Sequence, residues 1–218
     1  NIRALVCFSD MQPIEHLLTE YFKRKGKTTV TMQHGLYVDY GGMDTVNVIN
    51  YLHQPSDYFL AWGDCTKELI KAYHPDTSIE ICGKPKIHTG SADHSETDGL
   101  RPYITVFMDQ KIFDSENEEM LRIVCEYAEK EKLLVAVRFH PSLNKKAYLE
   151  KYPEIIERDY FLDAEFVVGH TSTLIYEALV LGCSTYRYRT SVPAIPLPKE
   201  FEFRNCFELS CCREVHQP

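Results

Sequence analysis

The sequence predicts an α/β protein made of two units, each containing a parallel sheet. Along most of the chain, short runs of β-branched and aromatic residues alternate with stretches whose apolar residues recur at helical spacing. Residues 89–102, rich in Gly, Ser, Asp, Thr and His, interrupt this alternation and are typical of a linker. We therefore predict a first unit over residues 1–88, a linker over 89–102 and a second unit over 103–218.

The first unit begins with a strand, a helix and a second strand. Strands are predicted over residues 4–8, 28–32, 57–62 and 78–82. One helix is predicted from Pro13, which suits a first turn, to Gly26, and another over 65–73 behind a capping Asp64. Residues 37–54 show little periodicity and are interpreted as a loop with short helical pieces. A strand–helix–strand order favours parallel pairing through a right-handed crossover.

The second unit repeats this rhythm. Strands are predicted over residues 103–107, 133–137, 164–168 and 184–188, and helices over 117–132, 145–152 and 174–181. Ligands of such sheets bind beyond the carboxyl ends of the strands, often in a crevice between units. The residues that follow the strands are therefore the candidates for function.

Composition excludes several classes of protein. A hydrophobic fraction of 44% with 26% charged residues is typical of a globular protein, and the net charge of -8 gives no footprint for nucleic-acid binding. No apolar run approaches the roughly 20 residues that span a bilayer. The chain begins at Asn1 rather than with methionine, which is compatible with a removed leader or segment.

The cysteines show no disulfide or zinc pattern. They lack a Cys-x-x-Cys pair and lie scattered, mostly inside apolar runs. We predict that all are reduced and structural, as in a cytoplasmic protein, rather than paired in disulfides. They are Cys7, Cys65, Cys82, Cys125, Cys183, Cys206, Cys211 and Cys212.

Polar residues follow four of the predicted strands. The four segments are Ser9-Asp10, Gln33-His34-Gly35, Arg138-Phe139-His140-Pro141 and Gly169-His170-Thr171-Ser172-Thr173. In the last, Gly169 relaxes the backbone and three hydroxyls precede a helix, whose unpaired N–H groups favour an anion. Plain N-capping by Thr171 or Ser172 is the alternative.

Four further side chains have a functional interpretation, and two of them, Glu177 and His34, also have an ordinary one. Glu177 lies in the same helix and can reach a ribose, or it can be a solvated helix residue. Arg138 and His140 alternate on one strand end and can both face a phosphate or a base. No tight His, Asp or Glu cluster accompanies them, so no metal site is expected. His34 is suited to accept a proton at neutral pH, or it is a satisfied core histidine.

These motifs, in this order, resemble GT-B nucleotide-sugar transferases. The residues that carry the resemblance are Gln33-His34-Gly35, Arg138-x-His140-Pro141 and the run from His170 to Leu179. Within that group the chain is most similar to the CDP-glycerol glycerophosphotransferases of teichoic-acid synthesis and the bacterial capsule sialyl- and polysialyltransferases. It also resembles UDP-N-acetylglucosamine 2-epimerases. The resemblance runs from about Leu5 to Tyr188.

The resemblance implies a GT-B-like fold of two Rossmann-like units with a cleft between them. The first unit would be incomplete, so that the chain is the C-terminal part of a longer polypeptide. We predict His34 and Asp10 as catalytic residues, with His34 the general base, and Gln33 and Gly35 on the acceptor side. The donor-binding residues would be Arg138, His140, His170, Thr171, Ser172, Thr173 and Glu177. Related proteins often have Ser or Asp where His170 stands.

The implied activity is metal-independent glycosyl or glycerophosphate transfer without a cofactor. The donor would be CMP-, CDP- or UDP-linked, and the acceptor a cell-surface polysaccharide or a polyol-phosphate polymer. The protein would lie in the cytoplasm, or at the inner face of the membrane through segments missing from this chain. A non-catalytic domain of an envelope-polymer assembly is one alternative. A 2-epimerase-like enzyme is another, and it is less favoured because only Asp10 and Glu177 offer suitable carboxylates.

Overall fold

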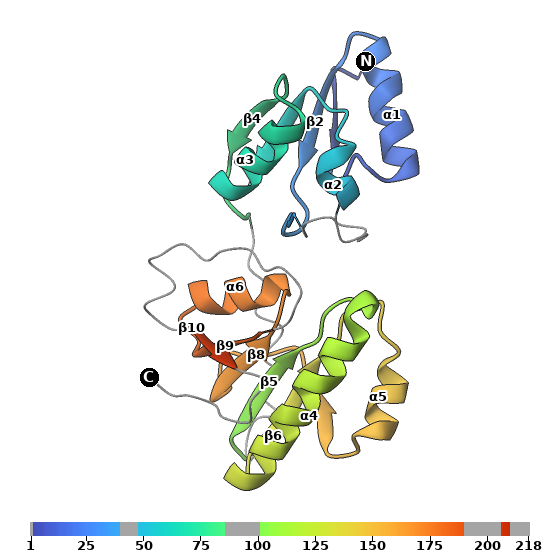
Figure 1. The fold of residues 1–218 in the computed structure, drawn as a ribbon. Coiled ribbons are helices and arrows are strands. Elements are labelled where there is room, and N and C mark those ends of the chain that lie inside the picture. The colour runs from blue at the N-terminus through green and yellow to red at the C-terminus, as the bar shows by residue number, and fades with distance from the viewer. Residues whose placement is uncertain (1, 40–47, 86–100, 190–205, 210–218) are drawn as a thin grey trace. The chain divides into compact units, whose positions relative to one another are not determined.

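The computed structural model describes residues 2–39, 48–85, 101–189 and 206–209, the last segment as backbone only (Figure 1). The chain divides into two compact units, Asn1–Ile87 and His88–Pro218. Most of the predicted linker, residues 89–100, lies outside the described residues.

The first unit is a four-stranded parallel sheet in the order β1-β2-β3-β4. The strands are β1 (Ala4–Cys7), β2 (Thr28–Met32), β3 (Tyr58–Ala61) and β4 (Ser78–Ile81). The helices between them are α1 (Pro13–Arg24), α2 (Ile49–Leu52) and α3 (Asp64–Tyr73). The four predicted strands and the two predicted helices are confirmed to within two residues at each end, and α2 is a short helix inside the predicted loop.

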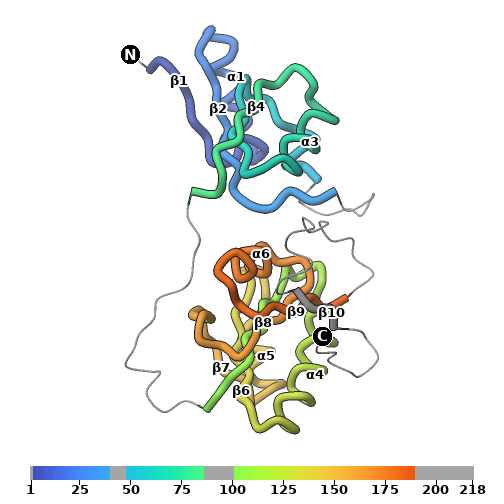
Figure 2. The backbone as a smooth tube through the Cα atoms, turned by 90° about the vertical axis from the view of Figure 1, so that its left-hand side faces the viewer, coloured from blue at the N-terminus to red at the C-terminus, as the bar shows by residue number. Residues whose placement is uncertain are grey.

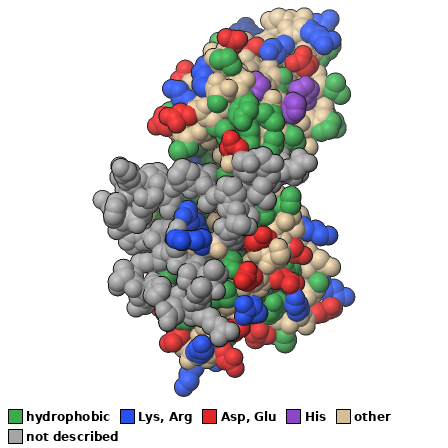
Figure 3. Space-filling view, viewed as in Figure 1, with side chains coloured by type: hydrophobic (Ala, Val, Ile, Leu, Met, Phe, Trp, Pro, Cys, Tyr) green, Lys and Arg blue, Asp and Glu red, His purple; other side chains and the backbone are tan. Residues whose placement is uncertain are grey.

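The first unit has an apolar core, and it also carries large apolar side chains on its surface. Tyr51, Phe59 and Ile70 are no more than 2% exposed and form part of its core. By contrast, several large apolar side chains of β1 and α1 and of the residues next to them are open to solvent, and we call them the β1–α1 surface: Ile2, Val6, Phe8, Ile14, Leu17, Leu18 and Tyr21. Hydrophobic side chains also gather on the face of this unit that is visible in Figure 3.

The second unit is a six-stranded parallel sheet in the order β10-β9-β8-β5-β6-β7. The strands are β5 (Tyr103–Phe107), β6 (Leu134–Arg138), β7 (Ile155–Glu157), β8 (Phe166–Gly169), β9 (Thr185–Tyr188) and β10 (Cys206–Leu209). The helices are η3 (Lys111–Phe113), a 3-10 turn, and α4 (Asp114–Glu131), α5 (Lys145–Lys151) and α6 (Thr173–Val180). The sequence did not predict η3, β7 or β10.

The sheet of the second unit is buried on both faces. Val106 and Val168 point into a core with residues of α4 and α5, whereas Phe107 and Val167 point into a second core with residues of α6. Neighbouring residues of one strand thus enter different cores, as expected when helices cover both faces of a parallel sheet. Figure 2 traces the backbone of these strands and helices as a smooth tube.

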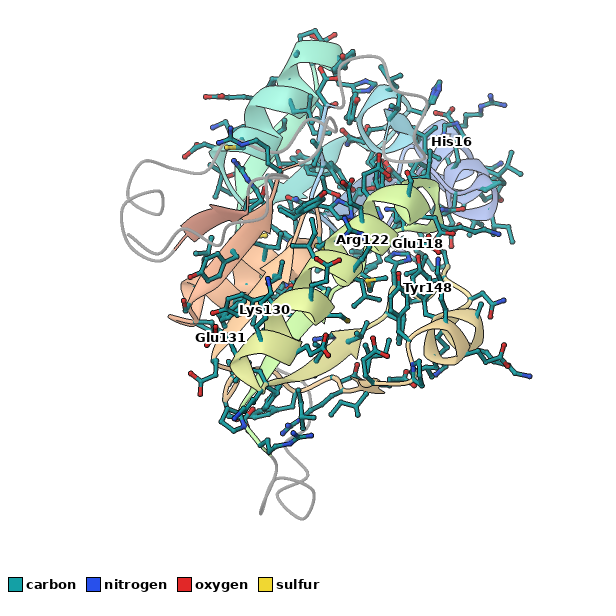
Figure 4. The ribbon with its side chains drawn as sticks, turned by 60° about the horizontal axis from the view of Figure 1, so that its bottom comes forward. His16, Glu118, Arg122, Lys130, Glu131 and Tyr148 are labelled. Atoms are coloured by element: carbon teal, nitrogen blue, oxygen red, sulfur yellow. The ribbon has the colours of Figure 1, made fainter. Side chains whose placement is uncertain are left out.

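Polar contacts also tie α5 to α4 in the second unit. The Tyr148 hydroxyl donates to the Asp114 carboxylate, and Lys151 Nζ lies 2.7 Å from Glu118 Oε1. Glu118 and Arg122 of α4 and Tyr148 of α5 are labelled in Figure 4. The packing of α4 and α5 on the same face of the sheet is therefore supported by side-chain contacts between the two helices.

The strand order fixes where a ligand would bind in the second unit. The chain runs from β5 to β6 and β7, and then returns to the other side of β5 for β8. The direction of winding therefore reverses between β5 and β8. Ligands of open parallel sheets bind at such a switch point, outside the carboxyl ends of the strands.

Gly169 ends β8 at this switch point, for a reason that the sequence did not show. A Cβ atom at this position would lie 2.9 Å from Ile175 Cγ1 and 3.4 Å from Phe107 Cβ. The glycine therefore permits α6 to pack closely against β8 and β5. This differs from the expectation that Gly169 relaxes the backbone, because its φ angle is not among the positive values of the chain.

Candidate functional site

Asp10 follows β1 and is 2% exposed. Its Oδ2 atom accepts hydrogen bonds from the Ser56 backbone N–H at 3.2 Å and the Ser56 hydroxyl at 2.7 Å. Ser56 Oγ also lies 2.8 Å from Thr31 Oγ1 of β2. Asp10 therefore ties the end of β1 to the segment that leads into β3. These contacts are within the protein, and the predicted catalytic role of Asp10 stays a prediction.

Gln33 follows β2 and is 2% exposed. Its Oε1 accepts from the Trp62 backbone N–H at 2.6 Å, and its Nε2 donates to the Gly35 carbonyl at 2.8 Å. Both ends of the amide thus hold the turn after β2 against the end of β3, and the predicted place of Gln33 on the acceptor side stays a prediction. At Gly35, a Cβ atom would meet no described atom within 4 Å, so packing does not require glycine there.

His34 lies between these two residues and is half-buried. Its Nδ1 is 3.1 Å from the Tyr37 hydroxyl, and its ring centroid lies 6.0 Å from that of Phe8. Burial lowers the pKa of His34 below its usual value, and the Asp10 carboxylate opposes this shift. The imidazole is therefore neutral at pH 7. In the tautomer whose Nδ1–H donates to the Tyr37 hydroxyl, the Nε2 lone pair can accept a proton.

In the second unit, Asp109 lies just after β5 and is 6% exposed. Its Oδ1 accepts from the Gln110 backbone N–H at 2.7 Å, and its Oδ2 accepts from the Thr171 hydroxyl. Sequence reasoning missed this residue. The signal was present, because Phe107-Met108-Asp109 ends its strand as Phe8-Ser9-Asp10 does in the first unit.

Asn117 and His170 frame Asp109. Asn117 Oδ1 accepts from the Asp109 backbone N–H at 2.9 Å, and Asn117 Nδ2 donates to the Asp109 carbonyl at 3.0 Å. These contacts fix the amide orientation, so His170 Nε2, 2.9 Å from Asn117 Oδ1, must be the donor. His170 is 1% exposed, and burial lowers its pKa against the opposing charges of Asp109 and Glu116. His170 thus lies in the interior, and its predicted role in donor binding stays a prediction.

Arg138 and His140, at the end of β6, take different partners. His140 Nδ1 accepts from the Ser142 backbone N–H at 3.1 Å, which places the ring proton on Nε2. Burial lowers the pKa of His140, and Asp109 opposes this shift. Arg138 Nε lies 3.7 Å from Asp159 Oδ1, and its Nη1 donates to the Asp159 carbonyl at 3.4 Å. Of the two, we therefore associate His140 with Asp109.

The three hydroxyls before α6 also differ from one another. Thr171 is buried and donates to Asp109. Ser172 is the N-cap, and its Oγ accepts from the Leu174 backbone N–H at 3.4 Å. Thr173 is the first helical residue. The predicted anion site therefore narrows to Ser172, Thr173 and the N–H groups of the first turn. Glu177, one turn further, is buried, which differs from the interpretation as a solvated residue.

The expectations for the cysteines, for membrane-spanning helices and for metal ligands can be compared with the described residues only. Cys7, Cys65, Cys82, Cys125 and Cys183 are free thiols, but Cys65 and Cys82 are exposed rather than buried. The side chains of Cys206, Cys211 and Cys212 lie outside the described part. Within that part, no helix has the length and apolar character needed to cross a membrane, and no three His, Cys, Asp or Glu side chains cluster as metal ligands would.

Comparisons with known proteins identify the fold and no closer relationship. No family model and no curated protein sequence matches the chain. A Methanocaldococcus jannaschii UDP-GlcNAc 2-epimerase, solved with UDP-GlcNAc and UDP, matches with a TM-score of 0.64 and 14% identity, covering 97% of this chain and 66% of that one. S. aureus MnaA with UDP matches with a TM-score of 0.67 and 13% identity, covering 96% and 62%.

A third solved structure matches with a lower score. The GtfA/B complex matches with a TM-score of 0.53 and 9% identity, covering 95% of this chain and 46% of that one. The chain thus spans less than two thirds of the length of these solved proteins. At such low identity the likeness concerns the fold alone. The protein has an α/β, GT-B-like fold with Rossmann-like parallel-sheet units, as its sequence predicted.

Proposed function

We propose that this protein is an enzyme that uses a nucleotide-activated donor and transfers a glycosyl or glycerophosphate group to a cell-surface polymer. One observation carries the proposal: Asp109, His140 and the Thr171–Thr173 turn follow three adjacent strands at the switch point of the second sheet. Two solved proteins of the same fold, the M. jannaschii and S. aureus proteins, hold UDP.

The donor's phosphates would bind at the start of α6. Ser172, Thr173 and the N–H groups of the first turn offer hydrogen bonds, and the helix dipole favours negative charge there. His140 Nε2–H would donate to the same group. As the bond between the transferred group and the nucleotide breaks, these donors would stabilise the charge that develops on the leaving phosphate. In this proposal no step is assigned to a metal ion.

His34 would act as the general base. An acceptor hydroxyl attacks the activated carbon or phosphorus of the donor, and the new bond forms as the bond to the nucleotide breaks. The hydroxyl proton passes to His34 Nε2, while Nδ1–H remains bonded to Tyr37. Because burial keeps the pKa of His34 below its usual value, the base is already in its neutral form at pH 7.

Calorimetric titration with CMP, CDP, UDP and GDP tests the donor site. We expect one nucleotide to bind more tightly than the others, and His140→Gln to weaken its binding about tenfold, the worth of roughly one hydrogen bond to a charged group. His53→Gln, which changes an exposed histidine of the first unit, is the matched control and should leave binding unchanged. If none of the four nucleotides binds, the proposed function is wrong.

A 2-epimerase-like activity is the second candidate. Asp109 favours it, since this buried carboxylate adds to Asp10 and Glu177 at strand and helix ends. Inversion at C2 of a sugar breaks its C2–H bond, so an epimerase incubated with UDP-N-acetylglucosamine in D₂O would incorporate deuterium at C2. A transferase would instead require an acceptor and leave C2 unlabelled. Nucleotide binding without either product would support a non-catalytic domain.

A further inference from the structure

The carboxylate of Asp109 lies close to the helix end of the proposed donor site. Its carboxylate accepts the hydroxyl hydrogen bond of Thr171, which directly precedes Ser172, the N-cap of α6. A carboxylate therefore lies beside the helix end that would hold the donor's phosphates. Because Asp109 is only 6% exposed, water screens its charge poorly.

The two histidines that interact with Asp109 carry no positive charge at pH 7 to offset its own. His170 Nδ1 lies 3.8 Å from Asp109 Oδ2, but burial lowers the pKa of His170 and leaves it neutral at pH 7. The pKa of His140 is lowered by burial in the same way. Arg138 is paired with the Asp159 carboxylate. Glu116, the other charged group that affects the pKa of His170, is also acidic.

The protein also holds Asp109 in place. Asn117 binds both its backbone N–H and its carbonyl, and the Gln110 N–H binds its Oδ1. His170 in turn binds Asn117. Four side chains and a backbone group thus form one buried network, so the carboxylate cannot swing away when an anion approaches. Its repulsion of added negative charge is built into the fold.

We propose that Asp109 sets the charge selectivity of the donor site, excluding a third phosphate or a free phosphate from the place beside Thr171 at the start of α6 and reserving that place for a hydroxyl-bearing group. A carboxylate accepts hydrogen bonds but repels phosphate, so the group beside it must be a donor such as a sugar or polyol hydroxyl. Nucleoside diphosphates linked to a sugar or polyol fit this pattern, and nucleoside triphosphates do not. The inference rests on the proposed function, since it concerns the same site.

Removing the charge of Asp109 tests the inference, because a purely structural role of this residue would not make the variants bind anions more tightly. We would measure the dissociation constants of UDP, UTP, CDP, CTP and inorganic phosphate for the wild type, Asp109→Asn and Asp109→Ser. For the wild type, the triphosphate of the preferred base should bind at least tenfold more weakly than its diphosphate. In both variants the triphosphate and phosphate should bind about tenfold or more tightly, because one like charge a few ångströms away is removed.

Glu119→Gln removes one charge from an exposed position of the same unit and is the matched control, with constants equal to the wild type. Unchanged or weaker anion binding in both Asp109 variants, with nucleotide binding by the wild type intact, would overturn the charge-selectivity inference alone. If neither variant folds, Asp109 is a folding residue and the inference is also wrong. If no protein binds any nucleotide, both the inference and the proposed function fail. Binding by the variants only would support the inference and contradict the function proposed for the natural chain.

Discussion

In the first unit Asp10 follows β1 and His34 follows β2, and in the second unit Asp109 follows β5 and His140 follows β6. Each aspartate comes two residues after a phenylalanine, and each histidine comes two residues after the last residue of its strand. In both pairs burial lowers the pKa of the histidine, and the aspartate opposes the shift. The two sheets thus place equivalent side chains at equivalent strand ends.

The partners of the two aspartates differ because of the position of their strands. β1 is an edge strand of the described sheet, and Asp10 accepts two hydrogen bonds from Ser56, which leads into β3. β5 is central, so Asp109 lies between the end of β6 and the start of α6. His34, in the unit where Asp10 follows the edge strand β1, is therefore suited to proton transfer. Asp109, which follows the central strand β5, lies beside the start of α6 instead.

The largest effect is expected at His34. His34→Ala should lower turnover by about two to four orders of magnitude, the usual worth of a general base, and leave nucleotide affinity and folding nearly unchanged. Steady-state kinetics with calorimetry would measure both quantities, with His53→Ala as the control. Near-normal turnover, or an unfolded variant, would show that His34 has a structural role. The proposed difference between His34 as a general base and His140 as a donor-binding residue would then be wrong.

The next effect is expected at Asp10. Asp10→Ala leaves the Ser56 N–H and hydroxyl without their acceptor, so we expect it to reduce the free energy of unfolding by about 2–4 kcal/mol. Urea unfolding of Asp10→Ala, Ser56→Ala and the double variant would give the coupling energy between the two side chains. A coupling energy near zero would contradict the anchoring role and make a direct role for Asp10 in the reaction more plausible.

The two glycines at strand ends should respond differently. Gly169→Ala forces a methyl group against Ile175 and Phe107, and we expect a loss of about 1–3 kcal/mol in the free energy of unfolding. Gly35→Ala meets no described atom and should change stability by less than about 0.5 kcal/mol. Thermal unfolding of both variants is the measurement. Equal losses would show that the close packing of α6 on β8 is not what requires Gly169.

The smallest effect concerns pH. In the folded state burial depresses the pKa of His170, so below about pH 6.5 the unfolded chain binds more protons and stability falls as pH falls. This single histidine can contribute a slope of up to about 1.4 kcal/mol per pH unit. Unfolding between pH 7 and pH 5 should therefore be less pH-dependent for His170→Asn than for the wild type. His53→Gln should keep the wild-type slope, and an unchanged slope in His170→Asn would contradict the prediction.

Periodicity was sufficient to predict most strands of four or more residues and the amphipathic helices, because these carry their own signal, although β10, with four residues, was missed. β7 has three residues and follows Tyr152-Pro153, so its signal was too short to separate from a turn. The start of α4 at Asp114 was also missed, since residues 114–116 are polar and the apolar spacing begins only at Met120.

The candidate site was predicted less completely, because partners distant in sequence decide what a polar residue does. His34 and His140 stood out beside Gly and Pro. His170 looked equally functional, but Asn117, 53 residues earlier, takes its Nε2–H and fixes it in the interior. Asp109 was overlooked because a single acidic residue after a strand is common, although it follows Phe107 as Asp10 follows Phe8. In the structure the hydrogen bond from Thr171 distinguishes it.

The β1–α1 surface has a consequence for the behaviour of this chain in concentrated solution. Ile14 and Leu17 are each 70% exposed, and short-range attraction between such surfaces is opposed by the net charge of -8 on every molecule. Salt shortens the reach of that repulsion to about 8 Å at physiological ionic strength and leaves the apolar attraction in place. The osmotic second virial coefficient, measured by static light scattering, should therefore fall as sodium chloride is added. Leu17→Glu should keep it positive, and an equal fall in that variant would assign the attraction to another surface.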